Sequence, residues 1–94
     1  MEQDDLILMT KYKNTLLKAL GKVILEKRTG LKKGINKFSF EYDIGNGLLS
    51  RLENGKSDVK ISTLWKIANA MGVKLSEIIK IVETELGEDF NFYN

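Results

Sequence analysis

Apolar residues recur at helical spacing through the first third of this chain. The repeating positions are Leu16, Leu17, Leu20, Val23 and Ile24. They predict a helix that begins at Leu6, with Asp4 or Asp5 as its N-cap, and runs to about Arg28. The dense apolar patch at residues 6–9 leaves two alternatives, an extra turn of this helix or a separate arm.

The last third of the chain predicts two more helices. The first spans residues 61–71, and its apolar stripe consists of Ile61, Leu64, either Ile67 or Ala68, and Met71. Gly72 ends it, and Ser76 is a suitable N-cap for a second helix that runs to Leu86. Trp65 lies opposite the stripe. We expect a neighbouring helix or the tail to bury it partly, and the alternative is a dimer interface.

The segment around residues 38–42 permits two local interpretations. Phe38, Phe40 and Tyr42 alternate with polar residues as in a strand, and residues 45–47 would then form a hairpin turn. In the helical interpretation, Ile35, Phe38 and Tyr42 share one face.

The next stretch predicts a short helix more clearly. Leu49 and Leu52 share one helical face, and Gly55 supplies the left-handed residue that ends such a helix. Because a helix this short is stable only when it is packed, its apolar face must be buried and its polar face remains free. We interpret the polar face as a DNA-reading surface.

Charge is distributed unevenly along the chain. All 15 lysines and arginines lie between residues 11 and 80, together with only six acids, whereas the two ends carry seven acids and no bases. A basic middle of this kind indicates affinity for polyanions. The acidic tail of residues 88–94 also contains Phe90, Phe92 and Tyr93. These aromatic residues either dock on the domain itself or contact a second copy, and we favour the second copy.

Composition narrows the function further. The 94 residues, 43% of them apolar, are sufficient for one small domain. The chain has no cysteine and no histidine, and it lacks the glycine patterns of phosphate loops and dinucleotide sites, so we expect neither an enzyme nor a metal or cofactor site. No apolar run approaches the roughly 18–20 residues that span a membrane, and the acidic start differs from a secretory signal, so we expect a cytoplasmic protein.

Two motifs carry a resemblance to a known family. Residues 50–55 read Ser-Arg-Leu-Glu-Asn-Gly, and residues 67–73 read Ile-Ala-Asn-Ala-Met-Gly-Val. Their sequences and separation resemble the helix-turn-helix domain of Cro and phage repressors, often called Xre-type, with Met71 in place of the usual leucine. The resemblance covers roughly residues 20–81.

This resemblance implies an all-α, compact five-helix bundle of the lambda repressor type. Its second helix would span residues 35–41 and its recognition helix residues 46–54. The domain would extend over residues 20–87, preceded by an extension at 1–19 that offers an interaction surface and followed by the tail at 88–94. The implied core residues are Phe38, Tyr42, Ile44, Leu49 and Leu52, with a small residue at Ser39, a left-handed turn residue at Asp43 and an N-cap at Gly45.

The resemblance also implies roles in DNA binding. The residues at base-reading positions are Asn46, Gly47, Ser50 and Arg51, and those placed to contact phosphates are Lys32, Lys33, Lys37, Lys56 and Lys60. Asn46 could pair with adenine, and Arg51 with guanine or a phosphate. The chain departs from the family at Ile35, where a glutamine often anchors a phosphate, and at Gly47, which has no side chain.

The expected function is sequence-specific regulation of transcription, as a repressor that binds double-stranded DNA as a homodimer. The alternative is a protein-interaction module on the same fold, with weak or no DNA readout and with apolar ends that bind an antitoxin-like or phage-regulatory protein partner. It is motivated by Ile35, Gly45 and Gly47 at reading positions and by the aromatic tail.

Overall fold

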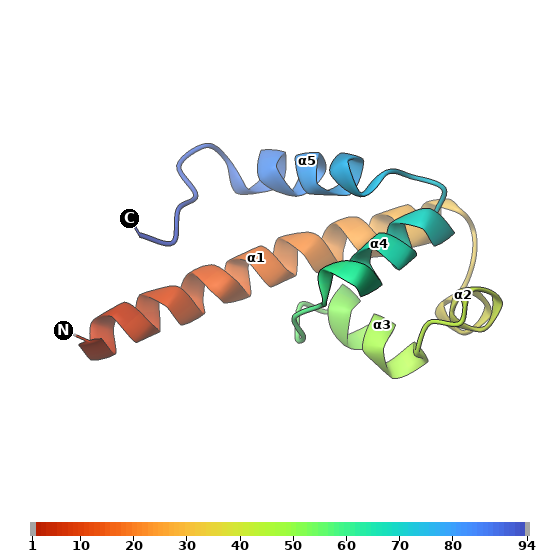
Figure 1. Cartoon of the computed structure of the whole chain (residues 1–94), viewed down its shortest axis with the longest axis horizontal. Coiled ribbons are helices and arrows are strands. Elements are labelled where there is room, and N and C mark those ends of the chain that lie inside the picture. The colour runs from red at the N-terminus through yellow and green to blue at the C-terminus, as the bar shows by residue number, and fades with distance from the viewer. Residues whose placement is uncertain (1, 94) are drawn as a thin grey trace.

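The computed structural model describes residues 2–93, with side chains described for Ile7 and from Met9 onward. Over that range the chain forms α-helices and no strand (Figure 1). The five helices are α1 (Glu2–Gly30), α2 (Ile35–Tyr42), α3 (Asn46–Glu53), α4 (Ile61–Ala70) and α5 (Leu75–Leu86). The predicted all-α bundle is confirmed, and the strand interpretation of residues 38–42 is wrong because this segment is part of α2.

Two predicted helix starts need correction. The helix α1 begins at Glu2, so Asp4 and Asp5 lie within it and do not cap it. Acidic residues favour the first turn of a helix because they face the positive end of its dipole, which is consistent with this earlier start. The helix α5 begins at Leu75 after Lys74, not after Ser76, because Leu75 packs against the core as the first residue of the helix.

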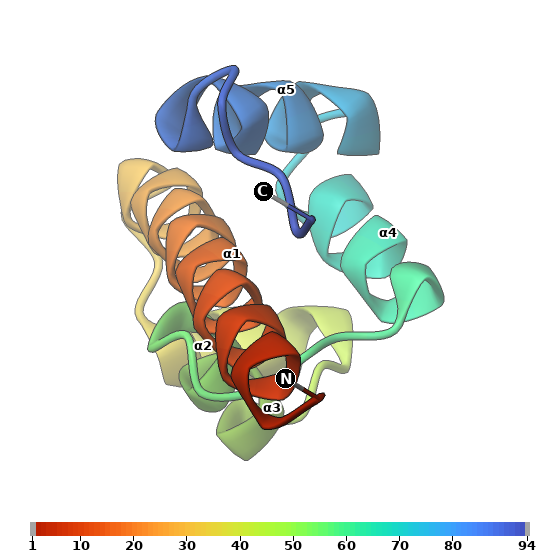
Figure 2. The ribbon, with the colours of Figure 1, turned by 90° about the vertical axis from the view of Figure 1, so that its left-hand side faces the viewer.

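The helix α1 is the axis of the bundle. It packs against α3 on one side and α5 on the other, while α2 packs against α3 and α4 against α5. Figure 2 looks nearly along α1 and shows α5 above it, α4 to one side, and α2 and α3 below. The largest fully buried side chains come from every helix: Val23, Ile24, Phe38, Leu49, Leu52, Ile67 and Ile78. Ile44 is buried as predicted, whereas Tyr42 is only half-buried at the edge of the core.

The backbones of α1 and α3 approach closely at Gly21. A Cβ atom at this position would lie 2.3 Å from the Leu52 carbonyl oxygen and 2.8 Å from that of Glu53. Gly55, which has a left-handed φ of 69°, packs just beyond, where a Cβ would lie 2.9 Å from the Cα of Lys18. The C-terminal half of α3 is therefore fixed on α1, and its N-terminal half extends away from α1.

The C-terminal tail turns back toward the N-terminal half of α1 (Figure 1). The ring of Tyr12 is 5.8 Å from that of Phe90 and 6.0 Å from that of Phe92, measured between centroids. These tail residues therefore dock on their own chain, which corrects the contact with a second copy that we favoured; Tyr93 remains 86% exposed. Residues 6–9 continue α1, with Ile7 and Met9 exposed, and the side chains of Leu6 and Leu8 lie outside the described part.

None of the helices in residues 2–93 is long and apolar enough to cross a membrane.

Candidate nucleic-acid interface

The helices α2 and α3 are joined by a tight turn at residues 43–45. Asp43 adopts the left-handed conformation that was expected of it, with φ 52°, and the N–H of Ile44 donates to the Ser39 carbonyl at 3.0 Å. The ammonium group of Lys66 on α4 donates to the Asp43 carbonyl at 2.6 Å. The buried side chain of Ile44 and the ammonium group of Lys66 thus hold the turn in place. The contact of Lys66 was not predicted from the sequence.

Three of the four predicted base-reading residues lie on the exposed surface of α3. Asn46, Gly47 and Arg51 are exposed, and Ser50 is half-buried. They occupy the first two turns of the helix, on the side opposite Leu49 and Leu52. The structure therefore brings the predicted readers together on one side of α3, with Asn46 and Gly47 in its first turn and Arg51 in its last turn.

Asn36, in the first turn of α2, is a site residue that sequence reasoning missed. Its Oδ1 accepts a hydrogen bond from Nδ2 of Asn46, so the two helices are linked at their N-terminal ends. An asparagine amide carries two donors and an acceptor. Asn46 therefore keeps one N–H and its Oδ1, the pair of groups that can bind the N7 and N6 atoms of adenine.

The N-termini of α2 and α3 both present unpaired backbone donors. Their N-cap residues are Gly34 and Gly45, neither of which makes a side-chain capping bond, and neither helix has an acid in its first turn. Unpaired N–H groups at a helix N-terminus, together with the helix dipole, favour a phosphate oxygen. Both helix ends can therefore serve as backbone anchors on a nucleic acid.

The five lysines predicted to contact phosphates differ in whether their ammonium groups are already paired within the protein. Within residues 2–93, Lys32, Lys56 and Lys60 make no side-chain ion pair or hydrogen bond, and all three are exposed. Lys37 is also exposed and lies 3.9 Å from a Glu41 oxygen. Lys33 is held by Glu41.

Lys33 folds back onto α2. Its Nζ atom lies 2.7 Å from Oε2 of Glu41 and 3.1 Å from the hydroxyl of Tyr42, and 5.0 Å from the centre of the Tyr42 ring. The hydrogen bond to Glu41 raises the pKa of Lys33 and lowers the pKa of the Glu41 carboxyl. Lys33 thus keeps its charge, but its ammonium group is turned toward α2 and is less free than the other lysines to contact a phosphate.

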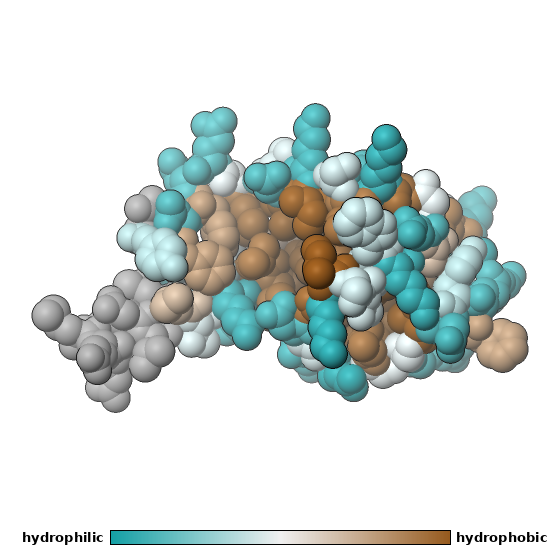
Figure 3. All heavy atoms as spheres, in the orientation of Figure 1, coloured by the Kyte–Doolittle hydropathy of each residue, from teal (hydrophilic) through white to brown (hydrophobic). Residues whose placement is uncertain are grey.

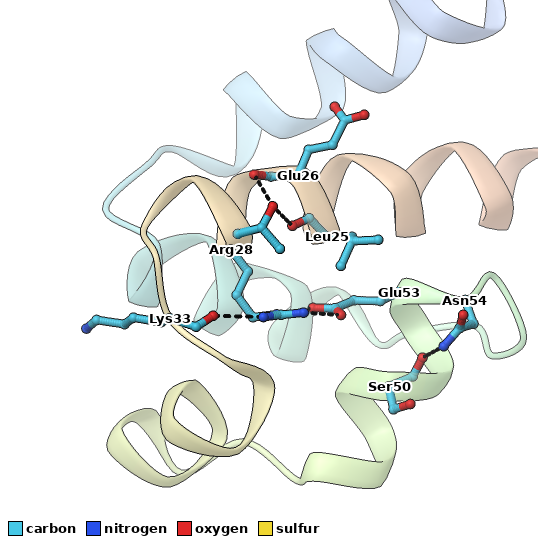
Figure 4. A network of polar contacts seen from close by, with 8 residues as sticks. Leu25, Glu26, Arg28, Lys33, Ser50, Glu53 and Asn54 are labelled. Carbon is cyan, nitrogen blue, oxygen red and sulfur yellow. Dashed lines mark hydrogen bonds and ion pairs between the residues drawn. The ribbon is translucent and has the colours of Figure 1, made fainter.

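A buried ion pair fixes α3 from behind (Figure 4). Nε of Arg28 lies 2.7 Å from one carboxylate oxygen of Glu53, and Nη2 lies 2.9 Å from the other. The remaining nitrogen, Nη1, donates to the Lys33 carbonyl at 2.8 Å. The hydrogen bonds to Glu53 raise the pKa of Arg28. One guanidinium therefore joins the end of α1, the loop before α2 and the end of α3.

Sequence reasoning missed this pair, although one signal was available. Glu53 follows Leu49 by one helical turn, so its side chain lies near the buried face of α3. A carboxylate in such a position needs a basic partner. Nothing in the sequence identifies Arg28 as that partner, because the two residues are 25 positions apart.

Comparison with known proteins agrees with this geometry. The sequence model of the helix-turn-helix family matches residues 24–78, from the C-terminal part of α1 to the first turn of α5. No significant match was found among curated proteins or among solved structures. The matched range covers more than half of the chain and contains α2, its turn and α3 in full. This chain therefore belongs to the Cro and phage-repressor (Xre-type) helix-turn-helix family, a family of DNA-binding regulators.

Proposed function

We propose that this protein is a sequence-specific repressor of transcription that binds double-stranded DNA with α3 in the major groove. The observation that carries the proposal is the shared exposed face of Asn46 and Arg51 on α3, beside uncapped helix N-termini. These two side chains can form paired hydrogen bonds to base edges, and the backbone amides can hold the phosphates on either side. Occupying the groove excludes other proteins from the same base pairs, which is sufficient for repression.

A second candidate function is that of a protein-interaction module on the same fold. It is supported by Phe40 on α2, which is 89% exposed, and by the absence of a side chain at Gly47. A large exposed aromatic residue is a common feature of protein interfaces. The docking of Phe90 and Phe92 on Tyr12 removes part of the support for this candidate, because the tail aromatics already have a partner within the chain.

Salt dependence of DNA binding distinguishes the two candidates. We expect the affinity for a random-sequence duplex, measured by fluorescence anisotropy, to fall steeply as salt increases, because phosphate contacts release counterions. Lys56→Ala should weaken binding to all sequences alike and reduce the log–log salt slope by about 1. Lys22→Ala is the matched control, because Lys22 pairs with Glu85 on the α1–α5 side. Weak binding that is independent of salt would refute DNA binding and favour the interaction module.

We also propose that the protein acts as a homodimer through α4 and α5. Trp65 was expected to be partly buried by a neighbouring helix or the tail, and 57% of its surface remains exposed. It borders a shallow groove of about 590 Å³ whose lining includes Val73, Leu75 and Ile79. Figure 3 shows apolar side chains gathered between α4 and α5 on this side of the molecule. A protruding ring beside an apolar groove suits a twofold contact, since each copy can place its ring in the groove of the other.

The emission of Trp65, the single tryptophan, tests this interface. We expect the emission to shift to shorter wavelength as protein concentration rises, in step with a monomer–dimer equilibrium measured by sedimentation, because dimerisation would remove the ring from water. Trp65→Ser should abolish the dimer. Phe40→Ser removes an aromatic ring that is also exposed, but on α2, and should leave the dimer intact. A dimer that survives Trp65→Ser would place the interface elsewhere.

A further inference from the structure

Gly47 is not required by the backbone of α3. Among the described glycines, only Gly55, Gly72 and Gly87 have positive φ angles, so Gly47 has a conformation that any residue can adopt. Glycine disfavours helices more than any residue except proline. Its presence in the first turn of the predicted reading helix therefore weakens α3 without any gain in backbone geometry.

The space beside Gly47 is occupied by Arg51. A Cβ atom at position 47 would lie 3.2 Å from Nη1 of Arg51, which is closer than an ordinary contact. Side chains in a helix lean toward its N-terminus and meet the residue four positions earlier, which is the relation of Arg51 to Gly47. The guanidinium thus lies beside the bare backbone at Gly47, in the first turn of α3. Arg51 makes no ion pair within the described residues, so no carboxylate there competes for its donors.

We propose that Gly47 is a specificity-determining residue that acts by giving the Arg51 guanidinium room across the first turn of α3, where it reads a guanine. The guanidinium fork matches the O6 and N7 acceptors of guanine, which no other base presents together in the major groove. This inference rests on the proposed function and deepens it, since it names the base that Arg51 reads and the residue that directs Arg51. A methyl group at position 47 requires the fork to shift by a few tenths of an ångström, while the charge of Arg51 remains.

Selection of bound duplexes from a random library tests the proposal with the full chain. Wild type should enrich a guanine at one position of each half-site, and Gly47→Ala should lower that preference on the order of tenfold. The matched control is Gly30→Ala, because Gly30 lies in α1, outside the predicted reading surface, and a Cβ there has no neighbour within 4 Å. This control should keep the guanine. The melting temperature of Gly47→Ala should equal or exceed that of wild type, because alanine favours the helix.

A double substitution shows whether Gly47 acts through Arg51. Arg51→Ala should itself remove the guanine preference, and adding Gly47→Ala to it should change nothing further. Unchanged guanine enrichment by Gly47→Ala would overturn the inference and leave the proposed function intact. A further change in the Arg51→Ala background would overturn it too, because the added methyl would then act on DNA directly. If wild type binds DNA but enriches no guanine, the inference fails alone; if wild type binds no DNA, the proposed function fails with it.

Discussion

Arg28→Ala is expected to lower the free energy of unfolding by about 3–5 kcal/mol, because it leaves the Glu53 carboxylate buried without a partner. Glu53 is 8% exposed, and Arg28 supplies both of its ion-pair contacts. The same substitution also leaves the Lys33 carbonyl without the Arg28 donor. Urea denaturation followed by circular dichroism measures the loss.

An exposed ion pair on the same helix provides the control for Arg28→Ala. Lys27 lies 3.0 Å from a Glu77 oxygen, and both side chains are substantially accessible to water. Lys27→Ala should therefore cost only about 0–1 kcal/mol. Replacing Arg28 with methionine and Glu53 with leucine together should recover much of the lost stability, since no charge is then buried. Equal effects of Arg28→Ala and Lys27→Ala would show that the buried pair contributes no more than an exposed one.

After Arg28→Ala, Gly21→Ala is expected to be the single substitution in the α1–α3 contact that lowers the stability of the protein most. Its methyl group would lie 2.3 Å from the Leu52 carbonyl oxygen, and a backbone atom cannot move aside as a side chain can. Adding volume at such a contact typically costs about 1–3 kcal/mol and occasionally more. We expect a loss at the upper end of this range or beyond it, because α1 and α3 must separate along their contact.

The same change at Gly30 is the control for Gly21→Ala. Gly30 is also in α1, but a Cβ there has no neighbour within 4 Å. Gly30→Ala should leave the urea midpoint unchanged or raise it, since alanine favours a helix over glycine. If both variants unfold at the same urea concentration, the close approach of α1 and α3 is not needed for stability.

Both substitutions affect the position of α3 as well as stability. The Arg28–Glu53 pair and the contacts of Gly21 all hold the C-terminal half of α3 against α1. The N-terminal half, with Asn46 and Gly47, projects from this support. The hydrogen bond between Asn46 and Asn36 holds the N-terminal end of α3 against α2. A helix held in this way can enter a groove with its side chains already oriented, which reduces the entropy lost on binding.

The local sequence was sufficient to predict the helices that have a clear apolar stripe and to predict where α3 and α4 end. The stripes of Leu49 with Leu52 and of Leu64 with Ile67 have helical spacing, and these four residues are buried. Gly55 and Gly72 adopt the left-handed conformation that ends a helix. The exposed face of Asn46 and Arg51 was predictable for the same reason, because burial of one face of a short helix leaves the opposite face in water.

Tertiary structure decided the features that depend on partners distant in the sequence. Phe38 and Phe40 are spaced as in a strand, where both rings would lie on the same face. In α2 the ring of Phe38 is fully buried, whereas the ring of Phe40 is 89% exposed. Packing of Phe38 against the core selects the helix. Glu53 pairs with Arg28 of α1, and the Asp43 carbonyl accepts a hydrogen bond from Lys66 of α4. The sequence by itself thus determined the all-α fold, the family and which face of α3 is exposed. Only the folded chain determined which charges are paired, because pairing over long separations depends on how the helices pack.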